Sequence, residues 1–593
     1  MEVHSPKTEY DYYGADGIYL SPSDTESENL RSMNMEYKLF EPLIAFLPFV
    51  DKSANTSTVL EHCCKLEREW VDIDILRSWV RTCNKVHTSH CLGTIPGTGT
   101  LPSRPQWLID VQNHCLVPAG LCDRYITLSY VWGSSNSTLT TTANLEELQK
   151  PNALKSTAVS LARTIRDAIQ LVSQLGESFL WIDKLCVVQD EAPEKKKSQL
   201  DAMGAIYAAS YLTIVAAQGD NDGEGLHGVS RPKRHRLAGR FKPASTYESQ
   251  HNQMVRRSAW QLIGTTWFCR GWTFQEHIFA RRKIIFHHDT VDWECHCLSW
   301  HERQGLVDES GQKPCEGFPA ISRIVPNNAP WPDMHRFARL VSMHNYRELT
   351  LPEDAIDAFA GILSQLCPSF EGGFVSGLPQ MFFDASLLWQ PYRPLKRRLP
   401  ERICSGQKAL PSWSWAGWHG NLHSESWRSA YGYIRRNPDE FGYSFLDGWQ
   451  PCSWHTMPTL EWYYSDDIGT EKKRILQALQ PGIERLCQSD EFPLEKGWTR
   501  HWCAESDRYY FRHECDSKQE FSYPIPLPKN DENSILVTRS RFLHCYTRRA
   551  HLRIGDPYIN WAASRCAVVD LIDDRGFWVG SLRLNCFPDE AKT

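Results

Sequence analysis

The sequence predicts an α/β protein built on a doubly wound, mostly parallel sheet. Between residues 122 and 298, short apolar runs rich in β-branched and aromatic residues alternate with amphipathic helical segments. Four of these runs predict strands, at residues 125–130, 179–182, 211–216 and 282–287. Because a helix or a long connection separates each strand from the next, we expect these strands to lie parallel.

The helices between these strands carry recognisable end signals. An apolar stripe over residues 157–175 ends before Gly176, a residue type suited to the position after a helix. A second helix is predicted from about residue 190 to 210, because Pro193 and several acids stand at its start. A third helical segment, residues 267–280, precedes the last of the four strands.

Before this region, residues 1–37 are polar and predict disorder. Residues 38–118 predict a helical flank, with apolar residues at helical spacing between residues 58 and 88. A break at residues 71–74 predicts two helices, the second capped by Asp72 or Asp74. A short strand is expected at residues 107–111.

Two clusters of polar residues resemble metal sites in composition. Zinc uses ligands of the kind found in Cys83, His87, His90 and Cys91, but two adjacent ligands fit poorly in one tetrahedral site. We interpret this cluster as a packed cysteine beside polar histidines. The acidic loop 219–225 lacks the glutamate of a calcium loop and predicts a turn. The sequence therefore predicts no metal site.

Residues 336–593 predict a separate C-terminal region. A helical pattern at residues 336–366 is followed, from residue 410 onward, by short β-like runs. The last two runs, 567–572 and 577–582, flank a turn typical of a hairpin. This region carries many of the 23 tryptophans, which favours flat packing surfaces over a catalytic centre.

Composition narrows the class of protein. The chain has 593 residues, which is too long for one core, and a net charge of -6, which argues against nucleic-acid binding by bulk charge. A basic run (Arg231, Lys233, Arg234, Arg236) is expected to be a solvated loop. We find no secretory signal and no apolar run of membrane-spanning length. The prediction is a cytoplasmic protein with reduced cysteines and no membrane or nucleic-acid partner.

Four sequence blocks, in order, resemble the fungal heterokaryon-incompatibility (HET) domain over residues 125–276. The blocks are Tyr125-x-x-Leu-Ser-Tyr130-Val-Trp132-Gly133, then Trp181-Ile-Asp183-x-Leu-Cys186-Val-Val-Gln189, then Met203-x-x-Ile-Tyr207-x-x-Ala, and then Arg270-Gly-Trp272-Thr-Phe-Gln275-Glu276. One departure is Val187, where isoleucine is more usual in this family.

The resemblance implies participation in fungal non-self recognition, in which incompatible fused cells die. It also implies partners among other incompatibility or signalling proteins, and self-association. HET domains are distantly similar to Toll/interleukin-receptor (TIR) domains, which implies a TIR-like fold. Some TIR domains hydrolyse NAD with a glutamate four residues after a tryptophan, and Trp272 and Glu276 have that spacing. NAD is then a substrate, and no cofactor is expected.

This analogy gives the candidate site residues their roles. Glu276 would stabilise the oxocarbenium-like state formed as the nicotinamide bond breaks, and Trp272 would offer a ring face one turn earlier. Ser129, Trp132 and Gly133 lie at the carboxyl end of the first strand, where a glycine lets backbone N–H groups approach a phosphate. Asp183 follows a second strand and would form the wall of the same cleft.

Each assignment has a structural alternative. Glu276 can pair with Arg281 or Arg282, Asp183 can brace a loop, and Trp272 can belong to the core. Cys186 has no histidine nearby in the sequence and is interpreted as a buried thiol.

For the whole protein, the alternative to an enzyme is a non-catalytic signalling module that assembles with like domains. A decayed family member that keeps the motifs without the activity is a third possibility.

Overall fold

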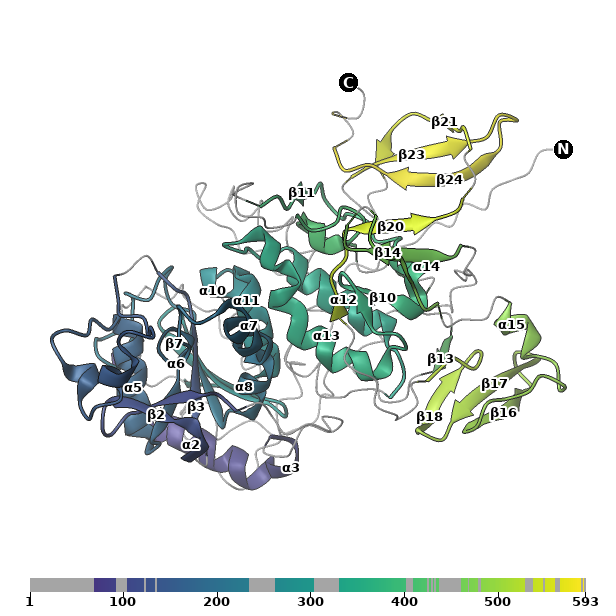
Figure 1. Cartoon of the computed structure of the whole chain (residues 1–593). Helices are drawn as coiled ribbons and strands as arrows, with labels where there is room; N and C mark the ends of the chain where they lie inside the picture. Colours follow the sequence, from purple (N-terminus) through teal and green to yellow (C-terminus); the bar gives the residue numbers. More distant parts are fainter. Residues whose placement is uncertain are drawn as a thin grey trace, which may run out of the picture.

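The computed structural model describes the HET-like α/β region and much of the C-terminal region (Figure 1). The described residues are 69–91, 104–121, 124–133, 136–233, 262–302, 330–400, 409–423, 426–427, 430, 433–436, 460–467, 469–477, 482–527, 537–547, 550–559, 566–587 and 590. Two predictions fall outside the described residues: the disorder of residues 1–37 and the first helix of the N-terminal flank. None of the helices in these ranges has the length and apolar character needed to cross a bilayer.

The α/β region is built on one eight-stranded sheet with the order β2-β1-β4-β3-β5-β6-β7-β8. Its strands are β1 (Trp107–Asp110), β2 (Cys115–Pro118), β3 (Ile126–Tyr130), β4 (Phe179–Trp181), β5 (Leu212–Ala216), β6 (Arg282–His287), β7 (Thr290–Cys295) and β8 (Ser299–His301).

The four central strands, β4-β3-β5-β6, pair in parallel, as the sequence predicts. Antiparallel strands extend both edges. The connections from β1 to β2, from β6 to β7 and from β7 to β8 are too short for a parallel crossover. The fold is therefore a mixed α/β sheet with a parallel centre.

Helices and loops connect the central strands. They include α4 (Leu145–Leu148), α5 (Arg163–Leu175), α6 (Asp183–Cys186), α7 (Pro193–Asp201), α8 (Met203–Ala209), α10 (Thr266–Cys269) and α11 (Gly271–Phe279). Gly176 ends α5 with a φ of 84°, and Pro193 begins α7, so both predicted signals are confirmed.

Two segments predicted as single helices are interrupted. The segment 190–210 divides at Ala202 into α7 and α8. The segment 267–280 divides at Arg270, whose extended backbone lies between α10 and α11. The reason is tertiary: the Gly271 N–H donates to the Glu348 carbonyl at 2.7 Å, and the Glu348 N–H donates to the Cys269 carbonyl at 2.6 Å.

The N-terminal flank contributes α2 (Ile73–Val86) and α3 (Thr88–Cys91). Asp72 caps α2, as the sequence allows: its Oδ1 accepts hydrogen bonds from the Asp74 and Ile75 N–H groups. α2 packs against α5 and β7, so the flank is part of the α/β unit.

The C-terminal region begins with α12 (Met334–Asn345) and α13 (Ala360–Leu366). The helical pattern predicted over 336–366 is broken where Pro352 begins a 3-10 turn. α12 contacts α11 and α13 contacts α8, and Figure 1 shows α12 and α13 between the α/β sheet and the C-terminal strands.

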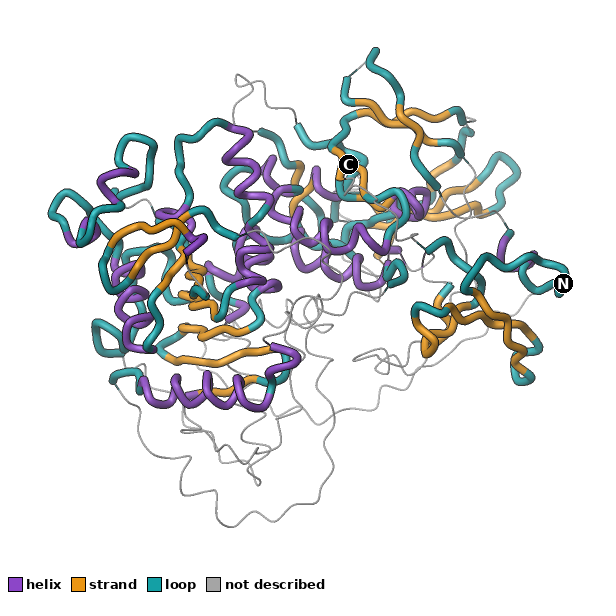
Figure 2. The backbone as a smooth tube through the Cα atoms, turned by 60° about the horizontal axis from the view of Figure 1, so that its bottom comes forward, coloured by secondary structure: helices purple, strands orange, loops and turns teal. Residues whose placement is uncertain are grey.

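The rest of the C-terminal region consists of small sheets with two short helices, α14 (Phe383–Ser386) and α15 (Ile483–Leu486). Figure 2 shows these strands on the side of the molecule away from the α/β sheet. Residues 567–572 and 577–582 form the predicted hairpin as β23 and β24. The strands are β9 (Phe374–Val375), β10 (Leu378–Pro379), β11 (Lys396–Arg397), β12 (Trp418–His419), β13 (Ile434–Arg436), β14 (Trp462–Ser465), β15 (Lys473–Arg474), β16 (Trp498–Cys503), β17 (Arg508–His513), β18 (Asp516–Phe521), β19 (Val537–Thr538), β20 (Phe542–Cys545), β21 (Arg553–Ile554), β22 (Tyr558–Ile559), β23 (Ala567–Ile572) and β24 (Trp578–Arg583).

Candidate functional site

The candidate site lies where the strand order of the parallel centre reverses. In chain order the parallel strands are β3, β4, β5 and β6, and in the sheet they lie as β4-β3-β5-β6. The connections from β3 and β5 therefore leave in opposite directions, and open α/β sheets commonly bind ligands beyond the carboxyl ends of strands at such a point. Ser129 and Tyr130 end β3 beside Val215 and Ala216 of β5. Motif residues thus converge where α/β sheets bind ligands.

Glu276 is buried against the end of β3. The Ser129 hydroxyl donates to its Oε2, and the Tyr207 hydroxyl lies 3.1 Å from the same oxygen. The Trp267 indole N–H donates in turn to the Ser129 Oγ at 2.8 Å. Among the described residues, no group hydrogen-bonds Oε1 of Glu276. The carboxylate is held through one oxygen, and the other remains for a ligand. We call Ser129, Asp183 and Glu276 the carboxylate cluster.

Burial sets the charge state of this cluster. Removal from water raises the pKa of Glu276 to about 7, and repulsion from Asp183 adds to that rise. Burial also raises the pKa of Asp183 to about 6, against the opposing effect of its hydrogen bond from Trp132. Both carboxyls therefore titrate near neutral pH, which is a common property of catalytic groups.

Asp183 stands at the start of α6 and is held by its neighbours. The Trp132 indole donates to Oδ2 at 2.8 Å, and the Lys184 N–H donates to Oδ1 at 2.7 Å. The Asp183 side chain is half-buried, as are Trp132 and Gly133. Asp183 therefore braces the connection after β4 and also reaches the more accessible side of the cluster.

Arg270 adds a cation to this region. Its half-buried guanidinium lies close enough to lower the pKa of both Asp183 and Glu276. The guanidinium itself makes no hydrogen bond or ion pair with any residue that the structure describes. An arginine without a fixed partner, beside two acids, is suited to binding an anionic ligand.

Gly133 and Lys184 connect the cluster to the loop after β5. A Cβ at Gly133 would come within 2.7 Å of the Asp222 Oδ1, so this glycine allows close approach of the chain itself. Asp222 forms a buried ion pair with Lys184, with Nζ and Oδ2 2.9 Å apart. The acidic loop is a turn, as predicted, and its Asp222 anchors α6 to it.

The remaining sequence candidates lie elsewhere or have structural partners. The Trp272 indole lies against the Asp354 carboxyl rather than among the groups that hydrogen-bond Glu276. Arg282 donates to Asn84 at 2.7 Å, so it does not take the expected alternative role of pairing with Glu276. Cys186 is a buried thiol, and burial raises its pKa to about 12.

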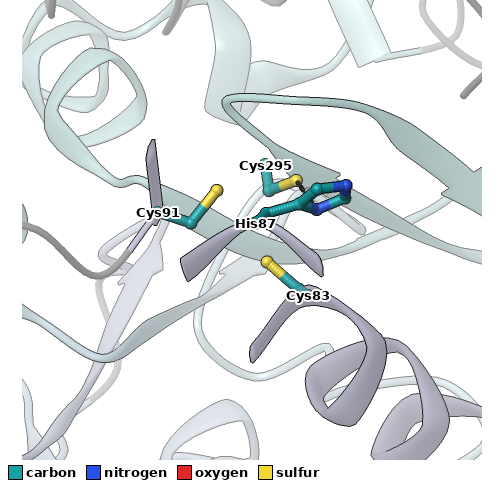
Figure 3. Close-up of side chains that lie close together, drawn as sticks. All are labelled: Cys83, His87, Cys91 and Cys295. Atoms are coloured by element: carbon teal, nitrogen blue, oxygen red, sulfur yellow. Dashed lines mark hydrogen bonds between the residues drawn. The ribbon is translucent and has the colours of Figure 1, made fainter. Parts of the chain in front are cut away.

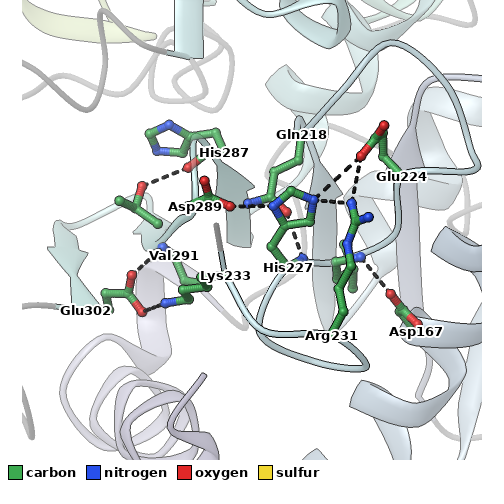
Figure 4. A network of polar contacts seen from close by, with 12 residues as sticks. Asp167, Gln218, Glu224, His227, Arg231, Lys233, His287, Asp289, Val291 and Glu302 are labelled. Atoms are coloured by element: carbon green, nitrogen blue, oxygen red, sulfur yellow. Dashed lines mark hydrogen bonds and ion pairs between the residues drawn. The ribbon is translucent and has the colours of Figure 1, made fainter. Parts of the chain in front are cut away.

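A second polar network lies at the neighbouring edge of the sheet (Figure 4). His227 contacts Asp289 and Arg231, Arg231 also pairs with Glu224 at 2.6 Å, and Lys233 pairs with Glu302. These contacts tie the loop after β5 to the turn between β6 and β7 and to Glu302. The expectation of a solvated basic run is wrong for Arg231 and Lys233, because acidic partners hold them in buried or partly buried positions. Arg234 and Arg236 lie outside the described residues.

Sequence reasoning missed three members of the site: Tyr207, Trp267 and Arg270. Tyr207 and Arg270 stand in the motif blocks, so a signal was present, but the sequence analysis gave neither residue a role in the site. Trp267 lies three residues before its block, and nothing in the sequence separates it from the other tryptophans.

Comparison with known proteins gives one finding. Residues 125–276 match a family model described as Heterokaryon incompatibility protein (HET), which confirms the resemblance and includes Ser129, Asp183 and Glu276. No curated protein and no solved structure matches the chain. The match indicates a function of the heterokaryon-incompatibility type for this region.

Proposed function

We propose that the HET domain hydrolyses the nicotinamide–ribose bond of NAD and thereby triggers or regulates incompatibility-type cell death in the cytoplasm. The observation that carries this proposal is the carboxylate cluster: Glu276 is held by Ser129 and Tyr207, within electrostatic range of Asp183 and Arg270. The position of the cluster at the reversal of strand order also supports a nucleotide ligand. The TIR-like analogy supplies the reaction, since some TIR domains that hydrolyse NAD have the same tryptophan–glutamate spacing.

The reaction needs few protein groups. The bond between the ribose C1′ and the nicotinamide nitrogen breaks, and its electron pair leaves with neutral nicotinamide. A water oxygen then bonds to C1′ and releases a proton, which gives ADP-ribose. Ionised Glu276 stabilises the positive charge that develops on the ribose, through its free Oε1. Ser129 and Tyr207 fix the carboxylate by holding Oε2.

Arg270 and Trp132 provide the complementary contacts. The Arg270 guanidinium, with no fixed partner among the described residues, would bind the pyrophosphate of the dinucleotide. Trp132 is half-buried, its indole N–H is engaged with Asp183, and the Lys184 ammonium lies over one face of its ring, 5.5 Å from the centroid. The other face would stack against a base or nicotinamide. Asp183 holds this ring in place.

The charge state of Glu276 gives the reaction a pH dependence. A pKa of about 7 leaves much of the carboxyl protonated at pH 6. Because the ionised form stabilises the transition state, turnover should rise as pH increases through 7.

The test is release of nicotinamide from NAD by the purified full-length protein. We expect wild type to release nicotinamide and Glu276→Gln to lose at least a hundredfold in rate. The control is Glu177→Gln, which removes a carboxylate from a pair with Arg124 at the protein surface and should keep the wild-type rate. No release by folded wild-type protein would refute the enzyme proposal. Release unaffected by Glu276→Gln would refute the residue assignment.

A non-catalytic assembly module is the second candidate. Its support is the exposed apolar hairpin at the C-terminus, where Phe577, Trp578 and Leu582 are 68%, 64% and 49% exposed. A surface of this kind favours contact with another protein or a second copy. Light scattering of the full-length protein, with and without Trp578→Ser, distinguishes this role: concentration-dependent assembly that the variant abolishes, without NAD cleavage, would favour it.

A further inference from the structure

Four metal-ligating side chains meet in the interior, away from the carboxylate cluster (Figure 3). They are Cys83, His87, Cys91 and Cys295, which we call the cysteine–histidine cluster. Each offers one ligand atom, all four atoms lie within 4.8 Å of one another, and all four residues are buried. Three of them come from the N-terminal flank and the fourth from β7. Both segments lie outside residues 125–276, the range that matches the HET family model.

Helical spacing brings the first three ligands onto one face. Cys83 lies in the last turn of α2, His87 follows α2, and Cys91 ends α3. The His87 N–H donates to the Cys83 carbonyl at 3.0 Å, and the Cys91 N–H donates to the His87 carbonyl at 2.9 Å, so each step is one helical turn. Residues four apart on a helix share a face. Cys91 completes this row.

The fourth ligand comes from the sheet. Cys295 ends β7, and its Sγ lies 3.7 Å from the Nδ1 of His87. In a tetrahedral zinc site with bonds of about 2.0 to 2.3 Å, neighbouring ligand atoms are about 3.5 to 3.8 Å apart. The observed separation fits that geometry without rearrangement of either element.

We infer that Cys83, His87, Cys91 and Cys295 bind one zinc ion that joins the N-terminal helices to the end of the sheet. Three thiolates and an imidazole form a common ligand set of structural zinc sites. All four ligand residues are buried, so protein side chains would fill all four positions around a tetrahedral ion, and tryptophans pack beside His87. Trp300 stacks on His87 and on Trp79, with ring centroids 6.3 and 6.4 Å apart, and Trp293 lies 5.9 Å from Trp300. The role is therefore structural rather than catalytic.

Charge and a neighbouring thiol define the limits of the site. Zinc with three thiolates carries a net negative charge, and the partly buried Arg281 lies within electrostatic range of Cys91. Cys297 lies two residues beyond Cys295, with its Sγ 3.9 Å from that of Cys91. It is half-buried, and we assign it to the edge of the site rather than to the ligand set.

The first test measures the metal content of the full-length protein as purified, by elemental mass spectrometry. We expect about one zinc per chain. Cys83→Ser and Cys295→Ser should each lower that ratio at least fivefold, whereas Cys115→Ser, at a buried thiol outside the cluster, should leave it unchanged. His87→Ala should lose zinc and His87→Cys should retain it. Cys297→Ser should also retain it.

A second measurement uses the wild-type protein and does not depend on the folding of variants. Cobalt exchanged into the site should give a thiolate-to-metal charge-transfer band and the visible bands of tetrahedral geometry. Zinc absent as purified and not taken up on titration would overturn the inference. Iron bound in place of zinc would also overturn it. So would a disulfide within the cluster, detected as a lower mass of the intact protein because two thiol hydrogens are lost. Loss of zinc from Cys297→Ser but not from Cys295→Ser would overturn the ligand assignment.

Discussion

The carboxylate cluster and the cysteine–histidine cluster belong to the same α/β unit but differ in what holds them. Ser129, Asp183 and Glu276 gather two acids in a buried site, where desolvation and mutual repulsion raise the pKa of both carboxyls. The cysteine–histidine cluster gathers groups that a single cation would bind together. The first arrangement costs stability, and the second gains it when the metal is bound.

This difference separates function from structure. Charged groups whose burial is unfavourable are typical of functional sites. Neutralising Glu276 should therefore remove activity and increase stability. Metal ligands that join distant segments of the chain stabilise the fold. Removing a cysteine ligand should therefore lower the stability of the protein more than its activity. The following changes test that separation, from the largest expected effect to the smallest.

The largest expected effect is that of Lys184→Met. This change leaves Asp222 as a buried carboxylate without its partner, since the two side chains are 3% and 0% exposed. Breaking a buried pair in this way should cost about 3–5 kcal/mol in the free energy of unfolding, measured with urea. The folded protein should retain its zinc, because Lys184 belongs to the connection after β4.

The matched control is Lys150→Met, at an exposed pair with Glu147. It should cost less than about 0.5 kcal/mol. A loss below about 1 kcal/mol for Lys184→Met would show that α6 is not anchored by this pair.

The next effect is the pH dependence of stability due to Glu276. Its folded pKa of about 7 lies above the ordinary value of 4.5, so the folded state holds its proton more tightly than the unfolded state. Stability from this group is present below pH 4.5 and is lost as pH rises to about 7. The interval corresponds to about 3 kcal/mol.

Glu276→Gln cannot ionise, so it does not lose free energy of unfolding as the pH rises. Relative to wild type, the variant should therefore gain up to about 3 kcal/mol between pH 5 and pH 8, measured by urea unfolding at each pH. Glu177→Gln serves as the control and should follow the wild-type pH profile. A Glu276→Gln variant that follows that profile as well would mean that the carboxylate is solvated.

The sequence predicted the carboxylate cluster better than the cysteine–histidine cluster. Strand periodicity and motif order located Ser129, Asp183 and Glu276 at the ends of strands or on the helix before β6, and a parallel sheet brings such positions together. The antiparallel edges were not predicted as such, because apolar periodicity does not specify strand direction. The orientation of Trp272 toward Asp354 depends on a contact between α11 and the C-terminal region, which no local pattern reports.

The sequence argued against a metal site at Cys83, His87, His90 and Cys91, because two adjacent ligands fit poorly in one tetrahedral site. That set held three members of the cysteine–histidine cluster but not the fourth. Cys295 lies about two hundred residues later, and only the pairing of β7 in the sheet brings it to His87. Ligands supplied by distant segments cannot be found from spacing alone.

A smaller effect is expected from Trp132→Phe, which removes the hydrogen bond to Oδ2 of Asp183. A bond from a neutral donor to a carboxylate contributes about 1.5–3 kcal/mol, so the pKa of Asp183 should rise by at least one unit above about 6. Carbon-13 carboxyl NMR of aspartate-labelled protein measures this pKa. NAD turnover should fall as well, and zinc content should not.

Trp107→Phe is the matched control for this change. Trp107 is also half-buried, and its indole N–H has no hydrogen-bond partner among the described residues. It should leave the pKa of Asp183 unchanged. Equal shifts in the two variants would mean that loss of indole volume, and not loss of the hydrogen bond, moves the titration.

The smallest expected effect is that of Asp72→Ala, which removes the cap of α2. The change should cost about 1 kcal/mol of unfolding free energy, because two N–H groups at the helix start lose their acceptor. Asp74→Ala, at an exposed pair with Arg77, should cost less than about 0.5 kcal/mol. Cys83 lies near the opposite end of α2, so both variants should keep zinc and wild-type NAD turnover. If Asp72→Ala lowered turnover as far as Trp132→Phe does, α2 would be coupled to the carboxylate cluster, and the two regions would form one functional unit.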